Sequence, residues 1–304
     1  MIDALSPPEP PRAPPGALQS PKRIAFDPAT VADIDAAFSR LLMNMPSDLE
    51  ISGRLFWQAR ELLGPNLDFL RLGFVRGLHE AFLNALLDTM LKCNAMRYHV
   101  VNFEALERNF LASIELADDG IHRSHSMLFE LEAFLFQMKS ALDLGVKMLG
   151  ALLPGRFRTS TFEAKGNSLV RALRQYRNDG SSKKDLVDGL IQVLCDDREA
   201  WLEQAINLRD QLAHHKTFAE FNYLARNLPN QRSVRKPMIC GIPPLEYMHL
   251  TYRKCIEFLQ DFMCFSIGLS LPTPFSVGVR ADGPCSVGEP LSDYVKFGLG
   301  SAQV

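Results

Sequence analysis

The sequence predicts an all-α protein built around an up-and-down bundle of helices. Apolar residues recur every three or four positions over 124–153, 184–213 and 244–269, which is the spacing of one buried helix face. Alternating strand patterns are nearly absent from the 304 residues, the clearest being 276–280. A helical bundle over 121–270, with an additional helical part in front of it, accounts for this pattern.

The first 22 residues contain seven prolines. That density is incompatible with a regular helix and favours extended polyproline segments. We expect residues 1–22 to form a disordered leader, and a ligand for a P-x-x-P-binding domain is the alternative.

Residues 23–120 form the predicted N-terminal helical region. A capping-box pattern at residues 47–50 opens a helix that ends at Leu63, before a Gly-Pro pair. A second stretch of helical spacing covers 66–92. The chain is then less regular until a helix near 102–115, and an Asp-Asp-Gly sequence follows as a break.

The segment 124–153 is the strongest helix of the chain, because its leucines and Met138 alternate three and four positions apart. Gly145 lies on this seam and would allow a neighbouring backbone to come close, and Pro154-Gly155 ends the helix. The other elements expected after it are a polar helix over 163–177, a long helix over 184–213 with a break near Asp196-Asp197, a mostly loop segment over 215–243, and a helix over 244–269. The tail over 271–304, rich in Pro and Gly, is expected to pack as coil or to stay mobile.

The charges nearly balance, with 33 Lys and Arg against 35 Asp and Glu. A chain of this kind has no global field to attract a nucleic acid or an anionic membrane, so any electrostatic site must be local. The N-terminus lacks the apolar region of a signal peptide, and no apolar run approaches the roughly 18 residues of a membrane span. We therefore expect a soluble, cytoplasmic protein that does not use a membrane as a partner.

Six cysteines occur without CxxC or CxxH spacing, which argues against a zinc site. Most of them lie in apolar helical segments and are expected to be buried thiols in a reducing compartment. His122 and His125 form an i, i+3 pair without a clear third ligand, so a cap and turn explains them better than a metal site. No nucleotide-binding or hydrolase motif occurs, and we expect neither a metal nor a cofactor.

The most informative string of the chain is Leu208-Arg209-Asp210-Gln211-Leu212-Ala213-His214-His215. Asp210 and His214 share a helix face, because four residues correspond to about 40° of rotation, so the carboxylate could orient the imidazole. Arg209 lies about 140° from His214 on a regular helix. The two would meet only if the helix frays near residue 213 or if a twofold dimer brings two such pairs into one cleft.

These residue types suit the cleavage of RNA without a metal. RNA carries its own nucleophile, the 2′-hydroxyl group, so the protein must supply a base, an acid and positive charge for the phosphorane. His214, with His215 as a lesser candidate, suits the acid–base work near neutral pH. Arg209 suits the bidentate contact with phosphate oxygens, and Asp210 would orient the histidine.

The string Arg209-Asp210-x-x-x-His214 resembles the R-x(4–6)-H motif of HEPN domains, in which a polar residue usually follows the arginine. The helix before it, the loop and the closing helix after it, and the acidic-to-apolar segment from 129 to 143 are also similar to that family. The resemblance covers about 122–270. It implies a homodimer with a composite cleft and metal-independent endoribonuclease activity, often in toxin–antitoxin or defence systems with an antitoxin as a partner. Position 216 is Lys, so the tyrosine found there in one branch of these toxins is absent.

A basic segment provides a candidate RNA-binding surface. Residues 156–184 hold eight cations against two carboxylates, and Tyr176 lies among them. We take as candidate RNA contacts Arg171, Arg174, Arg177, Lys183 and Lys184. The alternative is a solvated helix face balanced by the acids of 185–203.

Three functions remain open from the sequence. The first is a dimeric HEPN-like endoribonuclease acting on RNA. The second is a non-catalytic HEPN-like module that binds RNA or a nucleotide or serves as an adaptor, and the third is a plain helical scaffold. The sequence also leaves open whether Glu130 or Glu132 pairs with Arg209 across the bundle.

Overall fold

The computed structural model describes residues 78–115, 119–157, 161–179, 183–213, 221–228, 231–270, 275–280 and 296–301, the last two by backbone alone. The predicted leader over 1–22 and the predicted helix that ends at Leu63 lie outside these residues. Within the described residues the protein is mostly α-helical, as the sequence predicts. The elements are α4 (Leu78–Glu115), β1 (Gly120–His122), α5 (His125–Leu152), η2 (Glu163–Gly166), α6 (Asn167–Asn178), α7 (Lys184–Asp197), η3 (Arg198–Leu202), α8 (Glu203–Ala213), β2 (Tyr223–Leu228), β3 (Gln231–Arg235), α9 (Pro244–Ser270), β4 (Phe275–Arg280) and β5 (Lys296–Ser301).

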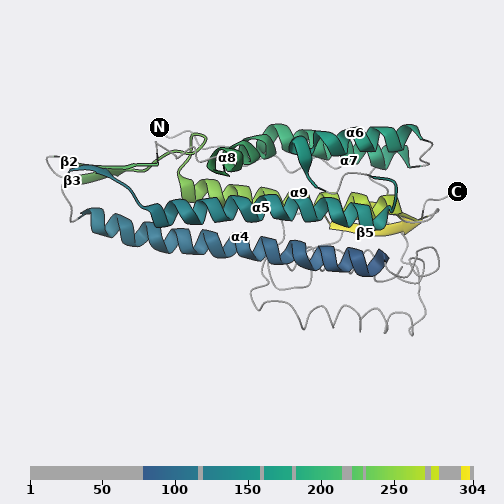
Figure 1. The fold of residues 1–304 in the computed structure, drawn as a ribbon, viewed down its shortest axis with the longest axis horizontal. Coiled ribbons are helices and arrows are strands. Elements are labelled where there is room, and N and C mark those ends of the chain that lie inside the picture. The colour runs from purple at the N-terminus through teal and green to yellow at the C-terminus, as the bar shows by residue number, and fades with distance from the viewer. Residues whose placement is uncertain are drawn as a thin grey trace.

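Three long helices, α4, α5 and α9, form the centre of the fold, and α6, α7 and α8 form a second layer over them (Figure 1). The seam predicted for 124–153 is the buried side of α5, which begins at the N-cap Ser124. Gly145 on that seam faces α9. A Cβ atom there would lie only 3.1 Å from Leu259 Cδ2, so the glycine permits the close approach of the two helices.

Helix α4 is continuous, so the prediction of an irregular stretch after residue 92 is wrong. Its buried residues do follow a helical period, but Leu91, Tyr98 and Val101 on the opposite side are also apolar. Because apolar residues occur on both sides of α4, the sequence does not show the amphipathic pattern that would have predicted one continuous helix. The buried residues of α4 belong to the same apolar core as those of α5, α7 and α9, so the bundle extends to residues before 121.

The 184–213 segment is helical with one wide turn in it. In place of the break expected near Asp196-Asp197, the structure has a π-helical turn, η3, between α7 and α8. Such turns insert one extra residue per turn and are frequent at functional sites. Here the turn changes the direction from which α8 presents its side chains.

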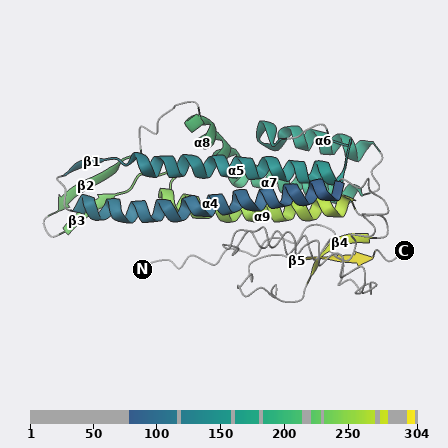
Figure 2. The same ribbon diagram turned by 60° about the horizontal axis from the view of Figure 1, so that its bottom comes forward.

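The segment 215–243, predicted to be mostly loop, contains a hairpin that the sequence did not predict: β2 and β3 pair antiparallel, and β1 pairs with β2. This sheet projects at one end of the long helices (Figure 2). The alternation of buried Phe221, Tyr223 and Ala225 is too short to stand out in the sequence. The candidate strand at 276–280 is confirmed as part of β4, which pairs with β5. The expectation of coil after Leu271 is therefore wrong where these two strands lie.

A buried carboxylate fastens the sheet to α4. Glu107 is 3% exposed and accepts hydrogen bonds from Tyr223 Oη at 2.6 Å and from Lys236 Nζ at 2.8 Å. Burial and the Glu107 contact raise the pKa of Tyr223, so the phenol stays a donor. The three residues come from α4, from β2 and from the segment after β3, and their contacts therefore hold the sheet against the bundle.

Loss of the phenol should weaken this attachment. In Tyr223→Phe the buried carboxylate of Glu107 loses one of its two donors, and we expect the free energy of unfolding to fall by about 1–3 kcal/mol. Urea denaturation measures the change. Tyr176→Phe is the matched control, because the Tyr176 side chain is only partly buried and contacts Phe157 through its ring. Equal stability of Tyr223→Phe and wild type would contradict the attachment.

Candidate functional site

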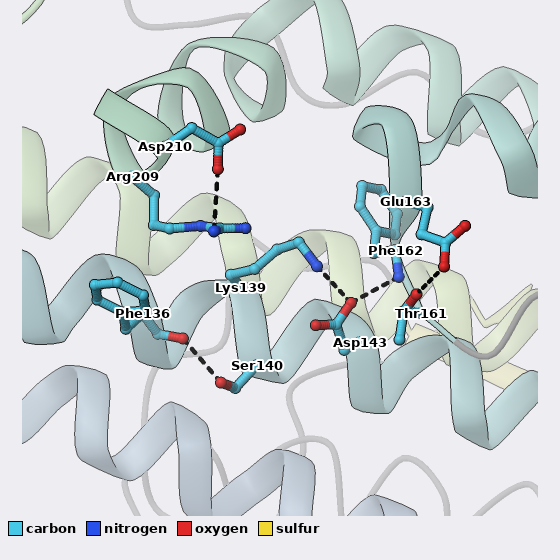
Figure 3. Close-up of polar contacts among 9 residues, drawn as sticks. All are labelled: Phe136, Lys139, Ser140, Asp143, Thr161, Phe162, Glu163, Arg209 and Asp210. Atoms are coloured by element: carbon cyan, nitrogen blue, oxygen red, sulfur yellow. Dashed lines mark hydrogen bonds and ion pairs between the residues drawn. The ribbon is translucent and has the colours of Figure 1, made fainter. Parts of the chain in front are cut away.

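Arg209 lies at the junction of α8 and α5 (Figure 3). Its Cζ atom is 5.8 Å from the centre of the Phe136 ring on α5, and its Nη1 atom is 3.0 Å from Oδ1 of Asp210. The side chain of Arg209 is 22% exposed. Among the described residues, its Nε atom is buried and has no hydrogen-bond partner. Within the described part of the chain, the guanidinium group is thus held in place by a ring and one carboxylate, and its Nε–H group has no acceptor.

A second cation, Lys139, lies on α5 three residues after Phe136 (Figure 3). Lys139 Nζ is 2.5 Å from Oδ1 of Asp143, and the same oxygen accepts a hydrogen bond from the backbone N–H of Phe162 at 2.6 Å. Asp143 therefore both orients Lys139 and joins the start of η2 to α5. Phe162 is itself buried, which fixes that junction.

The junction combines two half-buried cations with two carboxylates, so it carries no net charge. An incoming phosphate would compete with Asp210 and Asp143 for the donors of Arg209 and Lys139. A lysine ammonium has three N–H donors and an arginine guanidinium has five, so each cation can contact a carboxylate and such a ligand at the same time. The arrangement suits the contact of an anionic group that reaches α5 and α8 together.

The structure brings together Arg209 and Asp210 but does not describe the two histidines. Helix α8 ends at Ala213, and His214 and His215 follow outside the described residues. The described partner of Asp210 is Arg209 itself. Glu130 contacts His99 of α4, at 2.6 Å between Oε2 and Nδ1, and the described contacts of Arg209 include neither Glu130 nor Glu132.

Phe136, Lys139 and Asp143 are residues of this junction that the sequence did not identify as a site. The i, i+4 spacing of Lys139 and Asp143 was the available signal, but such pairs are common on any helix surface. The contact of Phe136 with the arginine depends on the packing of α8 over α5, which no local pattern reports.

The five predicted RNA contacts divide into two groups. Arg177 Nε is 2.6 Å from Asp188 Oδ1, and Lys183 donates a hydrogen bond to the Gly268 carbonyl at 2.6 Å, so these two cations hold elements of the fold together. Arg171 and Arg174 are exposed on α6, and Lys184 is exposed at the start of α7. Within the described part of the chain, no carboxylate pairs with these three.

Comparison with known proteins does not assign the chain to a family. No protein-family model matches it, and no curated protein or solved structure matches it significantly. Among the described residues, no three His, Cys, Asp or Glu side chains are grouped closely enough to hold a metal ion. None of the described helices is both long and apolar enough to cross a membrane.

A buried carboxylate lies at the turn that precedes α8. Asp197 accepts a hydrogen bond from Trp201 Nε1 at 2.6 Å. Burial raises the pKa of Asp197 from its ordinary value of 3.8 to about 6, although the Trp201 hydrogen bond and the charge of Lys254 act in the opposite direction. At neutral pH the carboxylate is therefore ionised at a cost to the folded state.

This cost predicts a specific dependence of stability on pH. Between pH 3.8 and about 6 the folded protein holds the Asp197 proton more tightly than the unfolded chain, so this contribution to stability is complete below pH 4 and is lost as the pH rises through 6. Asp197→Asn removes the titration and keeps an oxygen for Trp201. We expect the variant to be about 1–3 kcal/mol more stable than wild type at pH 7.5, and equal to it near pH 4, in urea denaturation. A constant difference across this range would contradict the assignment.

Proposed function

We propose that this protein is a HEPN-like, metal-independent endoribonuclease that works as a homodimer. The observation that carries the proposal is the position of Arg209, held half-buried against Phe136 of α5 near the end of a helix that the candidate histidines directly follow. A phosphate of RNA would contact Arg209 and Lys139. The resemblance of the Arg209–His214 string to HEPN domains supports a role in toxin–antitoxin or defence systems, with an antitoxin protein as the partner.

The proposed chemistry uses the 2′-hydroxyl of the substrate. His214 of one copy accepts the 2′-hydroxyl proton while the oxygen attacks phosphorus, and a histidine of the second copy donates a proton to the departing 5′-oxygen. The P–O5′ bond breaks and a 2′,3′-cyclic phosphate remains. Arg209 stabilises the charge on the phosphorane, and its contact with Phe136 limits the positions that its guanidinium can adopt.

The pairing of Asp210 with Arg209 favours one alternative, a non-catalytic module that binds RNA or a nucleotide. In that function an anionic ligand would have to displace the Asp210 carboxylate from the guanidinium group of Arg209, so only some anions would bind. Binding without cleavage would then be the activity of the site. The two functions differ in the role of His214, which is required for cleavage of RNA but not for binding alone.

Cleavage of a structured RNA in the presence of EDTA tests the first function. We expect Arg209→Ala and His214→Ala to lower the cleavage rate by about 100-fold or more, because each removes a charge or a proton carrier of the transition state. Arg253→Ala, which changes an exposed arginine of α9, is the matched control. Circular dichroism checks that each variant is folded.

Wild-type protein that binds but does not cleave this RNA would favour the binding module. Unchanged cleavage by folded His214→Ala would remove His214 from the mechanism. An RNA with a 2′-deoxynucleotide at the cleaved position should stay intact, since it lacks the nucleophile.

The exposed cations of α6 should contribute to RNA affinity. We expect Arg171→Gln with Arg174→Gln to weaken RNA binding and to lower the slope of log affinity against log salt by about 1.4, because each phosphate contact on a single strand accounts for about 0.7. Fluorescence anisotropy at several salt concentrations measures the slope. Arg108→Gln with Arg253→Gln is the control pair of exposed arginines, and an equal effect of both pairs would show that the α6 surface has no special role.

A further inference from the structure

The three-stranded sheet at the end of the bundle has one buried side and one exposed side (Figure 2). Tyr223 and Ala225 of β2 are buried against the helices. The ring centre of Tyr223 lies 5.2 Å from that of Phe110 on α4. Because successive side chains of a strand point to opposite sides, Leu224 and Arg226 of β2 point away from the core.

The strand register determines which residues share the exposed side. Ile121 of β1 is opposite Leu224 of β2, and Leu224 is opposite Arg235 of β3. Arg226 is opposite Ser233, so it lies on the diagonal from Arg235. Diagonal neighbours of this kind are typically about 7–8 Å apart. The register therefore brings Arg226 and Arg235 close together on the exposed side.

Three arginines gather on this side of the sheet. Arg226 and Arg235 are exposed, and among the described residues no carboxylate pairs with either of them. Arg123, which directly follows β1, is also exposed, and its Nε atom donates to the side-chain oxygen of Asn222, a neutral acceptor. The name outer sheet face is used below for these arginines and the two apolar residues beside them, namely Ile121, Arg123, Leu224, Arg226 and Arg235.

The outer sheet face carries a net positive charge. Asp119 immediately precedes β1, and continuation of the register by one residue would place it opposite Arg226. Three arginines against this one carboxylate leave a charge of +2. Lys236 lies on the other side, because it donates to the buried Glu107. Neighbouring arginines repel each other, and a ligand with several negative charges relieves that repulsion.

The apolar residues of the face indicate what accompanies the negative charges of the ligand. Ile121 is 65% exposed, and Leu224 beside it is partly exposed. They separate Arg123 on one side from Arg226 and Arg235 on the other. An unpaired base has a free flat side that can rest on such an area, whereas the bases of a duplex are stacked inside it. Phosphates with unpaired bases between them are the chemistry of a single-stranded nucleic acid.

The outer sheet face is also close to the candidate site along the chain. Helix α8, which carries Arg209, ends at Ala213, and the described residues resume at Phe221, directly before the sheet. Eight residues span at most about 29 Å, so the sheet begins within that distance of the end of α8. A nucleic acid bound at Arg209 therefore needs only a short extension to reach the sheet.

We propose that the outer sheet face binds single-stranded RNA that extends from the candidate site, with its arginines on phosphate groups and Ile121 against an unpaired base. The choice of RNA rests on the proposed function, whereas the face itself is assigned from register, exposure and charge. The sheet then selects RNA that is unpaired beside the phosphate bound at Arg209.

Binding of oligouridine to the full-length protein tests this proposal. The RNA has about 20 nucleotides, more than a typical single-strand site, and all proteins carry His214→Ala so that it stays intact. Adding Arg226→Gln with Arg235→Gln should raise the Kd by about 10-fold or more, because two charged contacts with phosphate are lost. The slope of log affinity against log salt should fall by about 1.4, and fluorescence anisotropy measures both quantities.

Two control pairs accompany this variant. Arg226→Lys with Arg235→Lys keeps both charges and should retain the salt slope. Arg108→Gln with Arg253→Gln removes two exposed arginines that pair with carboxylates elsewhere, and it should leave the Kd nearly unchanged. Circular dichroism checks that each variant is folded. An equal effect of the two glutamine pairs, or no effect of Arg226→Gln with Arg235→Gln, overturns the proposal.

The contact with an unpaired base has its own test. Ile121→Ala should raise the Kd for oligouridine by about 3-fold without changing the salt slope, because it removes apolar area and no charge. An RNA duplex of the same length should bind more weakly and should not respond to Ile121→Ala. Tighter binding of the duplex overturns the preference for a single strand.

Polyglutamate separates RNA from an acidic protein as the ligand. If Arg226→Gln with Arg235→Gln weakens the binding of polyglutamate and leaves that of oligouridine unchanged, the face recognises acidic protein and the proposal is overturned. None of these measurements depends on cleavage. Wild-type protein that binds RNA through the sheet but never cuts it would overturn the proposed ribonuclease and leave the outer sheet face as an RNA-binding surface.

Discussion

The inward side chains of α5, from Met127 to Leu152, are almost fully buried between α4 and α9. Twelve of its 28 residues are buried, and they lie on one side at helical spacing. A helix held this firmly along one side cannot rotate, so the directions of its outer residues are also fixed. Phe136 and Lys139 face α8, and Phe129 faces solvent, because the core leaves α5 no other orientation.

The same constraint reaches the second layer through α9. Gly145 of α5 and Gly189 of α7 both face α9, where Leu259 and Phe265 occupy the space that a side chain would need. Helices that approach this closely share a single core, in which deletions of volume are costly. The π-helical turn after α7 then determines how α8 crosses α5 and where Arg209 emerges.

Ionisable groups inside this core occur mainly in pairs that join separate elements. Glu107 joins α4 to the sheet, Asp143 joins α5 to η2, and Glu130 joins α5 to α4. Such contacts add little net stability, but the loss of one partner is costly, so they specify which surfaces meet. Arg209 differs from these groups, because its described carboxylate partner, Asp210, is the next residue of its own helix, whereas its contact with a second element is to the ring of Phe136.

The sequence by itself determined the helical class, because burial of one helix side imposes a period of 3.6 residues that appears in α5, α6, α8 and α9. It placed a break near Asp196-Asp197, where the structure instead has the π-helical turn η3. It could not reveal that α4 is one helix, since Leu91 and Tyr98 are apolar on the outer side, nor the short strands, whose alternation covers too few residues.

Only the tertiary structure decided the surroundings of Arg209. The ring of Phe136 is 73 positions earlier in the chain, and Lys139 is 70 positions earlier. Their proximity to the arginine follows from the packing of α8 across α5. A local pattern carries the chemistry of a side chain, but the distance between two helices depends on the whole core, and no single segment of the sequence contains it.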